Sequence, residues 1–256
     1  MTSTIDVAEL ESKVQEMYRA VAEQPHGRYH FEMGRPLAVR LGYPGKELDR
    51  IPEESLESFA GVGYFLDLAG LRPGESVLDL GSGSGTDCFL AALQVGPSGR
   101  VAGVDMTRAQ LDKAERLRDR AGLGYVSFVE DRIDHPPYDD GEFDAVISNG
   151  VINLAADKAR VFAEAARVLR PGGRLAIADI LTDAELPQSI VCNADLWASC
   201  IGGAAQRDAY LHAIESAGFR VHTVRENPYE FLSESARGAS VTYGVRSISL
   251  LAHRAA

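Results

Sequence analysis

The sequence predicts an α/β fold in which a mostly parallel, seven-stranded sheet carries helices on both of its faces. Two observations predict it. From about residue 75 onward, short apolar runs alternate regularly with segments of helical length, and glycine-rich or polar turns separate them. Strands that alternate with helices in this way are typical of a parallel sheet that is covered on both sides.

The N-terminal segment is predicted to form a helical cap over residues 1–70. Asp6 and Glu9 form a capping-box pattern, and apolar residues follow them at helical spacing. Residues 25–45 are rich in proline and glycine, which predicts a loop. A second helix is predicted over residues 52–68. None of these residues is needed to build the sheet.

The main domain is predicted over residues 71–256. The helix before its fifth strand is expected to stop at the Pro171-Gly172-Gly173 turn. After that strand, residues 182–206 interrupt the alternation as an insertion. An open α/β sheet binds its ligand at the carboxyl ends of the strands, so we expect the insertion and the cap to cover that ligand. The strands are expected at residues 76–80, 100–104, 125–129, 143–148, 175–180, 219–225 and 246–253, with a helix at 208–217.

Composition narrows the range of partners. The 256 residues include 26 Lys and Arg against 37 Asp and Glu, for a net charge of −11. Binding to nucleic-acid phosphates needs clustered positive charge, so no nucleic-acid partner is expected. No apolar run approaches the ~20 residues that span a bilayer. The first residues are polar and acidic, unlike a signal peptide. We therefore expect no membrane association and a cytoplasmic location.

The three cysteines are Cys88, Cys192 and Cys200. They are too few and too irregularly spaced for a disulfide framework, and none forms a Cys-x-x-Cys pair. We expect no metal site. Cys88 is interpreted as a small buried hydrophobic residue. The short interval from Cys192 to Cys200 would bring two thiols to one pocket if the chain turns there.

The turn after the first strand carries the most informative motif. In VLDLGSGSG, Asp79 precedes Gly81, Gly83 and Gly85, and glycines there allow a tight turn and close approach of a ligand to the backbone. Thr86 stands where the dinucleotide fingerprint has its third glycine. A carboxylate at Asp79 repels a pyrophosphate but suits an ammonium group. S-adenosylmethionine (SAM), which carries an ammonium and a sulfonium, therefore fits this turn better than NAD does.

The second mark of a nucleoside site is Asp105, at the end of the second strand. An acidic side chain there can accept hydrogen bonds from both ribose hydroxyls. By itself this residue does not discriminate among nucleosides, and a lone glycine-rich turn can be a bare connection between strand and helix. Asp79, the glycines and Asp105 in one βαβ unit together favour a SAM site.

Residues from about 40 to 225 resemble the arsenite methyltransferase branch of the class I SAM-dependent methyltransferases, which have a Rossmann-like fold. The resemblance implies that the turn after the first strand holds the amino-acid end of SAM. It also implies that Asp105 and Met106 lie at the ribose and adenine, with Ile133 near the adenine, and that Asn149 lies beneath the sulfonium. The matching pieces are LGYPGKELDRIPEES, VLDLGSGSGTDCFLAA, VGPSGRVAGVDMT, FDAVISNGVINL, RVLRPGGRLAIADI and DLWASCIGGA. The predicted cofactor-binding residues are Asp79, Gly81, Ser82, Gly83, Gly85, Asp105, Met106, Arg132, Ile133 and Asn149, with S-adenosylhomocysteine as the product.

The sequence departs from the family at the residues that hold arsenic. Arsenite methyltransferases bind trivalent arsenic through cysteine thiolates, which are soft ligands. Where the family has Gly-Cys-Gly, this chain has Gly61-Val62-Gly63, and Gly150 replaces the cysteine of Ile-Ser-Asn-Cys. Cys200 matches the third family cysteine, whereas Cys192 matches none. We therefore expect a small organic acceptor, with arsenite bound by Cys200 and Cys192 as the alternative.

Methyl transfer from SAM is an in-line displacement, so its main demand is that the acceptor be held on the reaction axis. A lone pair on arsenic or on a thiolate needs no general base, whereas a hydroxyl or an activated carbon usually does. His26, Tyr29 and His30 in the cap and Asp195 in the insertion are candidates, and each is also explained as a structural side chain. Cys200 and His30 are the predicted catalytic residues.

Two other classes of protein remain as alternatives. A nicotinamide-dependent dehydrogenase uses the same architecture, but Asp79 and Thr86 disfavour it. A non-catalytic SAM-binding sensor or partner subunit would keep the same turn, and turnover of SAM with any acceptor would exclude it. As partners we expect a small-molecule substrate, and we expect the chain to act as a monomer or homodimer.

Overall fold

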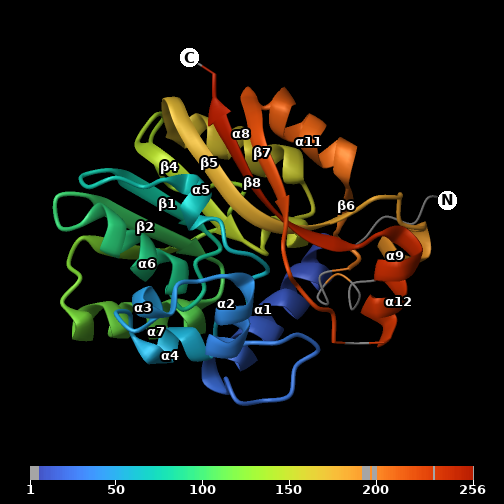
Figure 1. Cartoon of the computed structure of the whole chain (residues 1–256), viewed down its shortest axis with the longest axis horizontal. Helices are drawn as coiled ribbons and strands as arrows, with labels where there is room; N and C mark the ends of the chain where they lie inside the picture. Colours follow the sequence, from blue (N-terminus) through green and yellow to red (C-terminus); the bar gives the residue numbers. More distant parts are fainter. Residues whose placement is uncertain (1–5, 192–196, 198–200, 233, 256) are drawn as a thin grey trace.

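The computed structural model describes residues 6–191, 197, 201–232 and 234–255, and one sheet lies at its centre (Figure 1). The strands are β1 (Ser76–Leu80), β2 (Arg100–Asp105), β3 (Val126–Glu130), β4 (Phe143–Asn149), β5 (Leu169–Thr182), β6 (Ala205–Gln206), β7 (Phe219–Glu226) and β8 (Arg246–Arg254). Seven of them follow the order β3-β2-β1-β4-β5-β8-β7, and the short β6 pairs with β5 beside this path. All pairings are parallel except that β8 runs antiparallel to β5 and β7. The predicted α/β fold is confirmed, with β6 as an additional strand.

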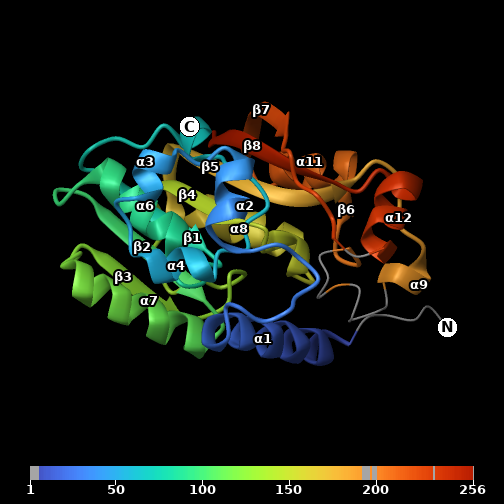
Figure 2. The same cartoon turned by 60° about the horizontal axis from the view of Figure 1, so that its bottom comes forward.

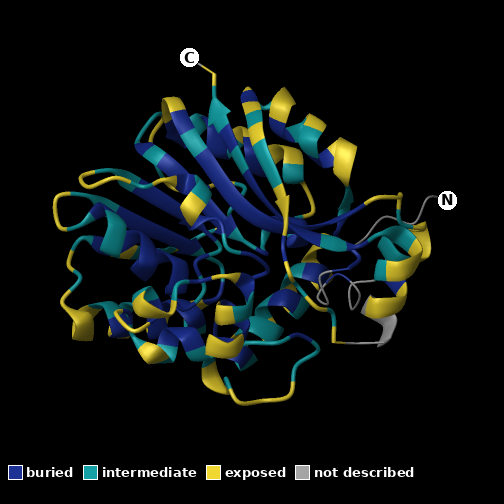
Figure 3. Ribbon diagram, in the orientation of Figure 1, coloured by how far each residue is buried: buried dark blue, intermediate teal, exposed yellow. Residues whose placement is uncertain are grey.

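Helices cover both faces of the sheet. The helices are α1 (Val7–Glu23), α2 (Gly34–Leu41), α3 (Gly45–Leu48), α4 (Glu53–Glu57), α5 (Leu66–Ala69), α6 (Thr86–Val95), α7 (Arg108–Ala121), α8 (Lys158–Val168), α9 (Gln188–Val191), α11 (Arg207–Ser216) and α12 (Glu234–Tyr243), with the 3-10 helix η1 (Ile152–Leu154). On one face α5 and α6 share a core with Ile147 of β4, and on the other α8 and α11 share one with Val146. Neighbouring strand residues point to opposite faces, so both must be apolar here. The central strands are accordingly buried (Figure 3).

The first helix begins where the sequence predicts. The Asp6 carboxylate accepts hydrogen bonds from the backbone N–H groups of Ala8 and Glu9, at 3.0 and 3.2 Å, which makes it the N-cap of α1. α1 buries Leu10 and Val14 and contacts α7, which it meets near the helix ends in Figure 2. None of the helices in the described part of the chain is long and apolar enough to cross a bilayer.

The prediction of one helix over residues 52–68 is wrong. The segment is broken into α4 and α5, and the loop between them contains Gly61 and Gly63. A Cβ on Gly63 would lie 2.0 Å from the amide nitrogen of Asn227, so this loop packs directly against another segment. Such long-range packing leaves no trace in helical periodicity. The predicted loop over 25–45 is also partly wrong, because it includes α2.

The prediction that Pro171-Gly172-Gly173 ends the preceding helix is also wrong. α8 already ends at Val168, and β5 begins at once with Leu169, which pairs with Phe143 of β4. The register then shifts, and regular pairing resumes at Arg174. Proline lacks an N–H donor and Gly172 has φ +75°, so the turn forms an irregularity inside the strand.

The C-terminal elements α11, β7 and β8 agree with their predicted ranges to within one residue, whereas α12 between the last two strands was not predicted. Within the predicted insertion, a Cβ on Gly203 would lie 1.9 Å from the backbone oxygen of Asn153 in η1. The segment before β6 therefore packs closely on the chain that follows β4. The boundary between a cap over 1–70 and a domain over 71–256 stays a prediction.

Candidate active site

A pocket lies at the carboxyl ends of β1, β2, β3 and β4. Its inner wall comes from the turns that follow these strands, and its outer wall comes from α1 and the loop after α4. This edge is where an open α/β sheet binds its ligand. The described residues that line the pocket are Leu10, Glu11, Val14, Tyr18, Ser58, Phe59, Ala60, Gly61, Asp79, Gly81, Ser82, Gly83, Ser84, Thr86, Asp87, Asp105, Met106, Thr107, Gln110, Asp131, Arg132, Ile133, Asp134, Asn149, Gly150, Val151, Leu154, Ala155 and Ala156.

The turn after β1 places its backbone on the pocket wall. Gly81 has φ +78°, and a Cβ there would lie 2.6 Å from the side chain of Val151, so glycine alone fits. The N–H of Gly83 donates to Oδ2 of Asp105 at 2.9 Å, which ties the turn to the end of β2. The Ser82 side chain is 7% exposed, and its hydroxyl has no hydrogen-bond partner among the described residues. The turn therefore leaves one buried hydroxyl for a ligand.

Asp105 is held rigidly at the end of β2. Its Oδ2 accepts the hydrogen bond from Gly83, and its Oδ1 accepts one from the backbone N–H of Thr107 at 2.8 Å. Burial raises the pKa of the Asp105 carboxyl, and the bonds from Thr107 and Gly83 oppose that rise. Each carboxylate oxygen has a second lone pair. A carboxylate fixed in this way can accept two hydroxyl groups from a ligand without first reorienting.

Two further carboxylates of the pocket are deeply buried. Asp79 of β1 and Asp87 of α6 are 2% and 5% exposed. Asp87 accepts hydrogen bonds from the Tyr43 hydroxyl at 2.7 Å and the Asn149 amide at 2.9 Å, and Asp79 accepts one from the Cys88 thiol at 3.2 Å. Burial raises the pKa of Asp87 to about 6, against the effect of its bonds from Asn149 and Tyr43. Burial also raises the pKa of Asp79 well above its ordinary value.

The Asn149 side chain joins several segments at the end of β4. Its amide nitrogen donates to the backbone oxygen of Gly63 at 3.1 Å and to the Tyr43 hydroxyl at 2.9 Å, and its Oδ1 accepts the N–H of Val62 at 2.8 Å. These bonds fix the orientation of the amide. They also hold the loop between α4 and α5 against the pocket.

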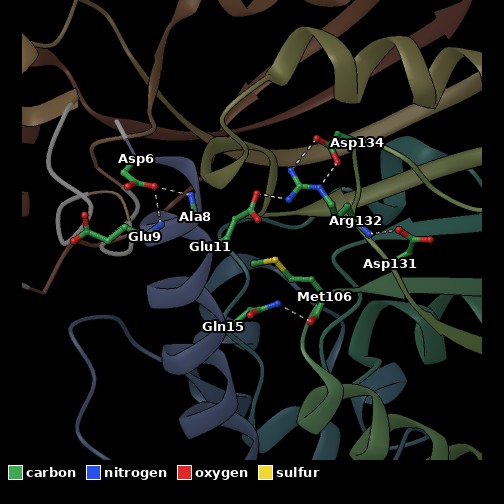
Figure 4. Close-up of polar contacts among 9 residues, drawn as sticks. All are labelled: Asp6, Ala8, Glu9, Glu11, Gln15, Met106, Asp131, Arg132 and Asp134. Carbon is green, nitrogen blue, oxygen red and sulfur yellow. Dashed lines mark hydrogen bonds and ion pairs between the residues drawn. The ribbon is translucent and has the colours of Figure 1, made fainter. Parts of the chain in front are cut away.

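The N-terminal helix closes one side of the pocket (Figure 4). Arg132, after β3, forms ion pairs with Glu11 of α1 and with Asp134, the latter at 2.9 Å. The Gln15 amide donates to the backbone oxygen of Met106 at 3.1 Å. α1 is thus attached to the loops after both β2 and β3, across the pocket edge.

The pocket wall is rich in acidic side chains and poor in basic ones. Among the described lining residues the basic side chains amount to one guanidinium, and Glu11 and Asp134 already pair with it. Such a wall attracts a cationic ligand and repels a phosphate chain. The six acidic lining residues are Glu11, Asp79, Asp87, Asp105, Asp131 and Asp134.

A family model described as a methyltransferase domain matches residues 71–218, which is more than half of the chain. The chain belongs to this methyltransferase family. The matched segment begins just before β1 and ends after α11, so it contains every strand turn of the pocket. The predicted family is therefore confirmed.

Relatives of this chain place it in the arsenite methyltransferase-like branch. An arsenite methyltransferase of Halobacterium salinarum is 40% identical over 197 residues, which are 76% of this chain and 50% of that protein. The crystal structure of an arsenic(III) S-adenosylmethionine methyltransferase from Chlamydomonas reinhardtii is 36% identical, with a TM-score of 0.70, and covers 83% of this chain and 73% of that one. A ubiquinone/menaquinone biosynthesis C-methyltransferase of Haemophilus ducreyi is 28% identical over 75% of each chain. The chain spans about half the length of these curated arsenite methyltransferases.

Nine of the ten predicted cofactor-binding residues line the pocket, and Gly85 does not. Gly85 has φ +89° and precedes α6, and a Cβ there would lie 2.9 Å from the rings of Phe128 and Phe89. Its absent side chain therefore serves packing of α6 on the sheet. That the nine residues bind SAM stays a prediction.

The described pocket lining does not include the predicted catalytic residues. His30 packs edge-on against Phe31, with ring centroids 4.7 Å apart, and is not among the described residues that line the pocket. Its catalytic role stays a prediction. Cys192, Asp195 and Cys200 lie outside the described residues. No group of three or more side chains that suit a metal ion occurs within the described ranges.

Sequence reasoning missed Asp87 and Tyr43. Asp87 had a usable signal, because it lies in the first turn of the helix that follows the glycine-rich turn, where a carboxylate faces the pocket end of the sheet. Tyr43 had none, since only folding brings it to Asp87 and Asn149.

The structure brings together the two positions where the family pattern has cysteines. Val62 is 1% exposed, and a Cβ on Gly150 would lie 3.1 Å from its Cγ1. Gly150 lines the pocket, as does Gly61 beside Val62. At this point the pocket wall is therefore the backbone of Gly61 and Gly150, and the buried Val62 side chain packs against Gly150, where the family pattern would place two adjacent thiols.

Proposed function

We propose that the protein transfers the methyl group of SAM to a small organic acceptor. The observation that carries the proposal is the pocket at the carboxyl edge of the sheet, which is lined by six acidic side chains and one guanidinium. SAM brings an ammonium and a sulfonium to these carboxylates, whereas a dinucleotide would bring further negative charge. The similarity to a protein titled an S-adenosylmethionine methyltransferase supports this cofactor.

The residues fit SAM group by group. Asp105 would accept hydrogen bonds from the two ribose hydroxyls, and Met106 and Ile133 would contact the adenine. Asp79 would accept a hydrogen bond from the ammonium. The Ser82 hydroxyl, which has no partner among the described residues, would hydrogen-bond to the amino-acid end of SAM. When bound, SAM supplies an electrophilic methyl group for an in-line displacement. The protein's own part is to hold the acceptor at attack distance, and the fixed Asn149 amide supports that geometry.

The acceptor side favours an organic molecule over arsenite. Trivalent arsenic needs two or three thiolates around it, and two of the family positions are the adjoining Val62 and Gly150. Val151 and Leu154, which follow Gly150 in the pocket lining, are apolar and suit a carbon skeleton. The similarity to a protein named as a ubiquinone/menaquinone C-methyltransferase supports an organic acceptor in chains of this type.

The experiment has two stages. Calorimetric titration with SAM tests the cofactor, and absence of binding would contradict the proposal. Methyl-labelled SAM is then incubated with a panel of phenols, quinones, amines and thiols, and separately with arsenite and a thiol reductant, with products followed by mass spectrometry. Label on an organic acceptor supports the proposal. Arsenite-dependent product that is lost in Cys200→Ser, with Cys192→Ser as the comparison, would establish arsenite as the substrate. SAM binding without turnover of any acceptor would favour the non-catalytic alternative.

A further inference from the structure

Asp79 and Asp87 are two buried carboxyl groups that lie near each other, because the thiol of Cys88, next to Asp87 in the chain, donates to Asp79 at 3.2 Å. The described residues supply this pair with no cation. Both side chains line the pocket and are almost fully enclosed. Arg132, the basic side chain among the described lining residues, is held in ion pairs with Glu11 and Asp134. The unpartnered, buried Ser82 hydroxyl lies in the same wall and independently indicates a polar ligand at this place.

The groups that face this pair are neutral or negative. Asp87 accepts hydrogen bonds from the Tyr43 hydroxyl and the Asn149 amide, and the ring of Tyr64 packs against that of Tyr43. Asp79 meets the Cys88 thiol of α6, and Asp105 of β2 adds a further negative charge nearby. Hydrogen bonds from neutral donors stabilise a carboxylate less than a cation does, so two ionised carboxylates here repel each other without compensation.

The surroundings decide which of the two acids ionises first. Asp87 lies in the first turn of α6, where the helix N-terminus favours negative charge, and it accepts two hydrogen bonds. Its pKa is raised by burial to about 6. Burial and then repulsion by Asp87 raise the pKa of Asp79 well above its ordinary value, against the weak bond from the Cys88 thiol. Asp87 therefore carries the charge, and Asp79 retains the proton.

We propose that Asp87 is a positioning residue for the cofactor: it keeps Asp79 protonated in the ligand-free protein, so that the arriving ammonium of SAM displaces one proton to solvent. The inference rests on the proposed function, because it takes SAM as the ligand. The O–H bond of Asp79 breaks and its proton passes to water or buffer. The resulting carboxylate accepts an N–H bond from the ammonium, which keeps its own charge. While the α-amino group of SAM is protonated, SAM binding should then strengthen with pH until Asp79 is ionised in the free protein.

The test measures proton release during binding. SAM is titrated calorimetrically into the full chain, in two buffers of different ionisation enthalpy, from about pH 5 to about pH 7.5, where the α-amino group of SAM stays protonated. The expected result is release of about one proton per SAM below the titration of Asp79, where the dissociation constant falls about tenfold per pH unit. S-adenosylhomocysteine keeps the ammonium and should release the same proton. Methylthioadenosine keeps the adenine and ribose but lacks the amino-acid end, so it should bind without release.

The variants isolate Asp87 from other carboxylates. In Asp87→Asn the repulsion on Asp79 is removed, so the pH range of proton release should move down by about one unit or more. The matched control is Asp144→Asn at the amino end of β4, outside the pocket, where the backbone N–H of Ser76 keeps an acceptor. It should release protons as the unaltered chain does. If Asp87→Asn fails to fold, the ligand comparison in the unaltered chain still decides.

Three outcomes overturn the inference while leaving the proposed function in place. They are a binding enthalpy independent of buffer throughout the pH range, equal proton release with methylthioadenosine, and an Asp87→Asn profile that coincides with that of the unaltered chain. Failure of the unaltered chain to bind SAM would overturn both proposals.

Discussion

The proposed function divides the pocket into a cofactor half and an acceptor half, which are built from different kinds of residue. The cofactor half draws its polar groups from one βαβ unit, where Asp79, Ser82 and Asp105 stand at the ends of β1 and β2. The acceptor half places Val62 against Gly150, which come from segments far apart in the chain. A short local motif thus specifies what the first half can bind, whereas the second half depends on which side chains folding brings together. Cofactor binding and acceptor choice can therefore change independently.

The largest expected effect is on the cofactor half. Asp105→Ala should weaken SAM binding about 1000-fold, because the ligand loses two charge-assisted hydrogen bonds of about 1.5–3 kcal/mol each. Calorimetric titration measures it, with thermal unfolding as the check on folding. Glu130→Ala, at the exposed end of neighbouring β3, is the matched control and should bind normally. A loss of affinity below about tenfold would mean that Asp105 does not accept hydrogen bonds from the ribose, and the assignment of the cofactor half to this βαβ unit would lose its main support.

The next largest expected effect is on the stability of the folded chain, through a buried carboxyl group outside the pocket lining. Asp179 at the end of β5 is buried, accepts the Tyr210 hydroxyl at 2.6 Å, and does not line the pocket. Burial raises its pKa to about 6, against the effect of the bond from Tyr210. The folded chain therefore holds a proton that the unfolded chain has lost between about pH 4 and about pH 6. The free energy of unfolding should fall by up to about 3 kcal/mol as the pH rises through this window.

Asp179→Asn should remove this component of the pH dependence, because an amide does not titrate. Chemical denaturation at several pH values measures the slope in both chains. Asp183→Asn, whose carboxylate is exposed and paired with Arg246, provides the comparison and should keep the slope of the unaltered chain. Parallel slopes in Asp179→Asn and the unaltered chain would show that Asp179 is ionised in the folded protein.

The acceptor half can be tested by restoring thiols. In a Val62→Cys, Gly150→Cys double variant, two adjoining thiols should bind trivalent arsenic at least about tenfold more tightly than the unaltered chain does. Gly150 has φ +71°, so the second substitution costs about 1–2 kcal/mol of stability. Arsenite titration, followed by competition with a dithiol, measures the affinity. SAM affinity should remain unchanged, and a parallel loss of SAM binding would show that the two halves are coupled.

The same division explains what the sequence could predict. The strands and the glycine-rich turn follow from local patterns, and nine of ten predicted cofactor residues line the pocket because they stand at strand ends, whose position an α/β sheet determines. The break between α4 and α5 could not be predicted, because it depends on Gly63 meeting Asn227 across the fold. Tyr43 was missed for the same reason, since its partners Asp87 and Asn149 are distant in sequence.

The smallest expected effect concerns the edge between α1 and the strand turns. Glu11 pairs with Arg132 across the pocket edge (Figure 4), with the two side chains 31% and 46% exposed. A half-exposed ion pair contributes about 0.5 kcal/mol, so Glu11→Gln should speed SAM dissociation about twofold, and added salt should abolish the difference. Glu9→Gln is the matched control, because Glu9 pairs with Lys13 on the same helix and does not line the pocket. Stopped-flow displacement of SAM measures both rates. Equal rates in the two variants would mean that α1 covers the cofactor through its apolar residues, Leu10 and Val14, and that the ion pair does not slow SAM dissociation.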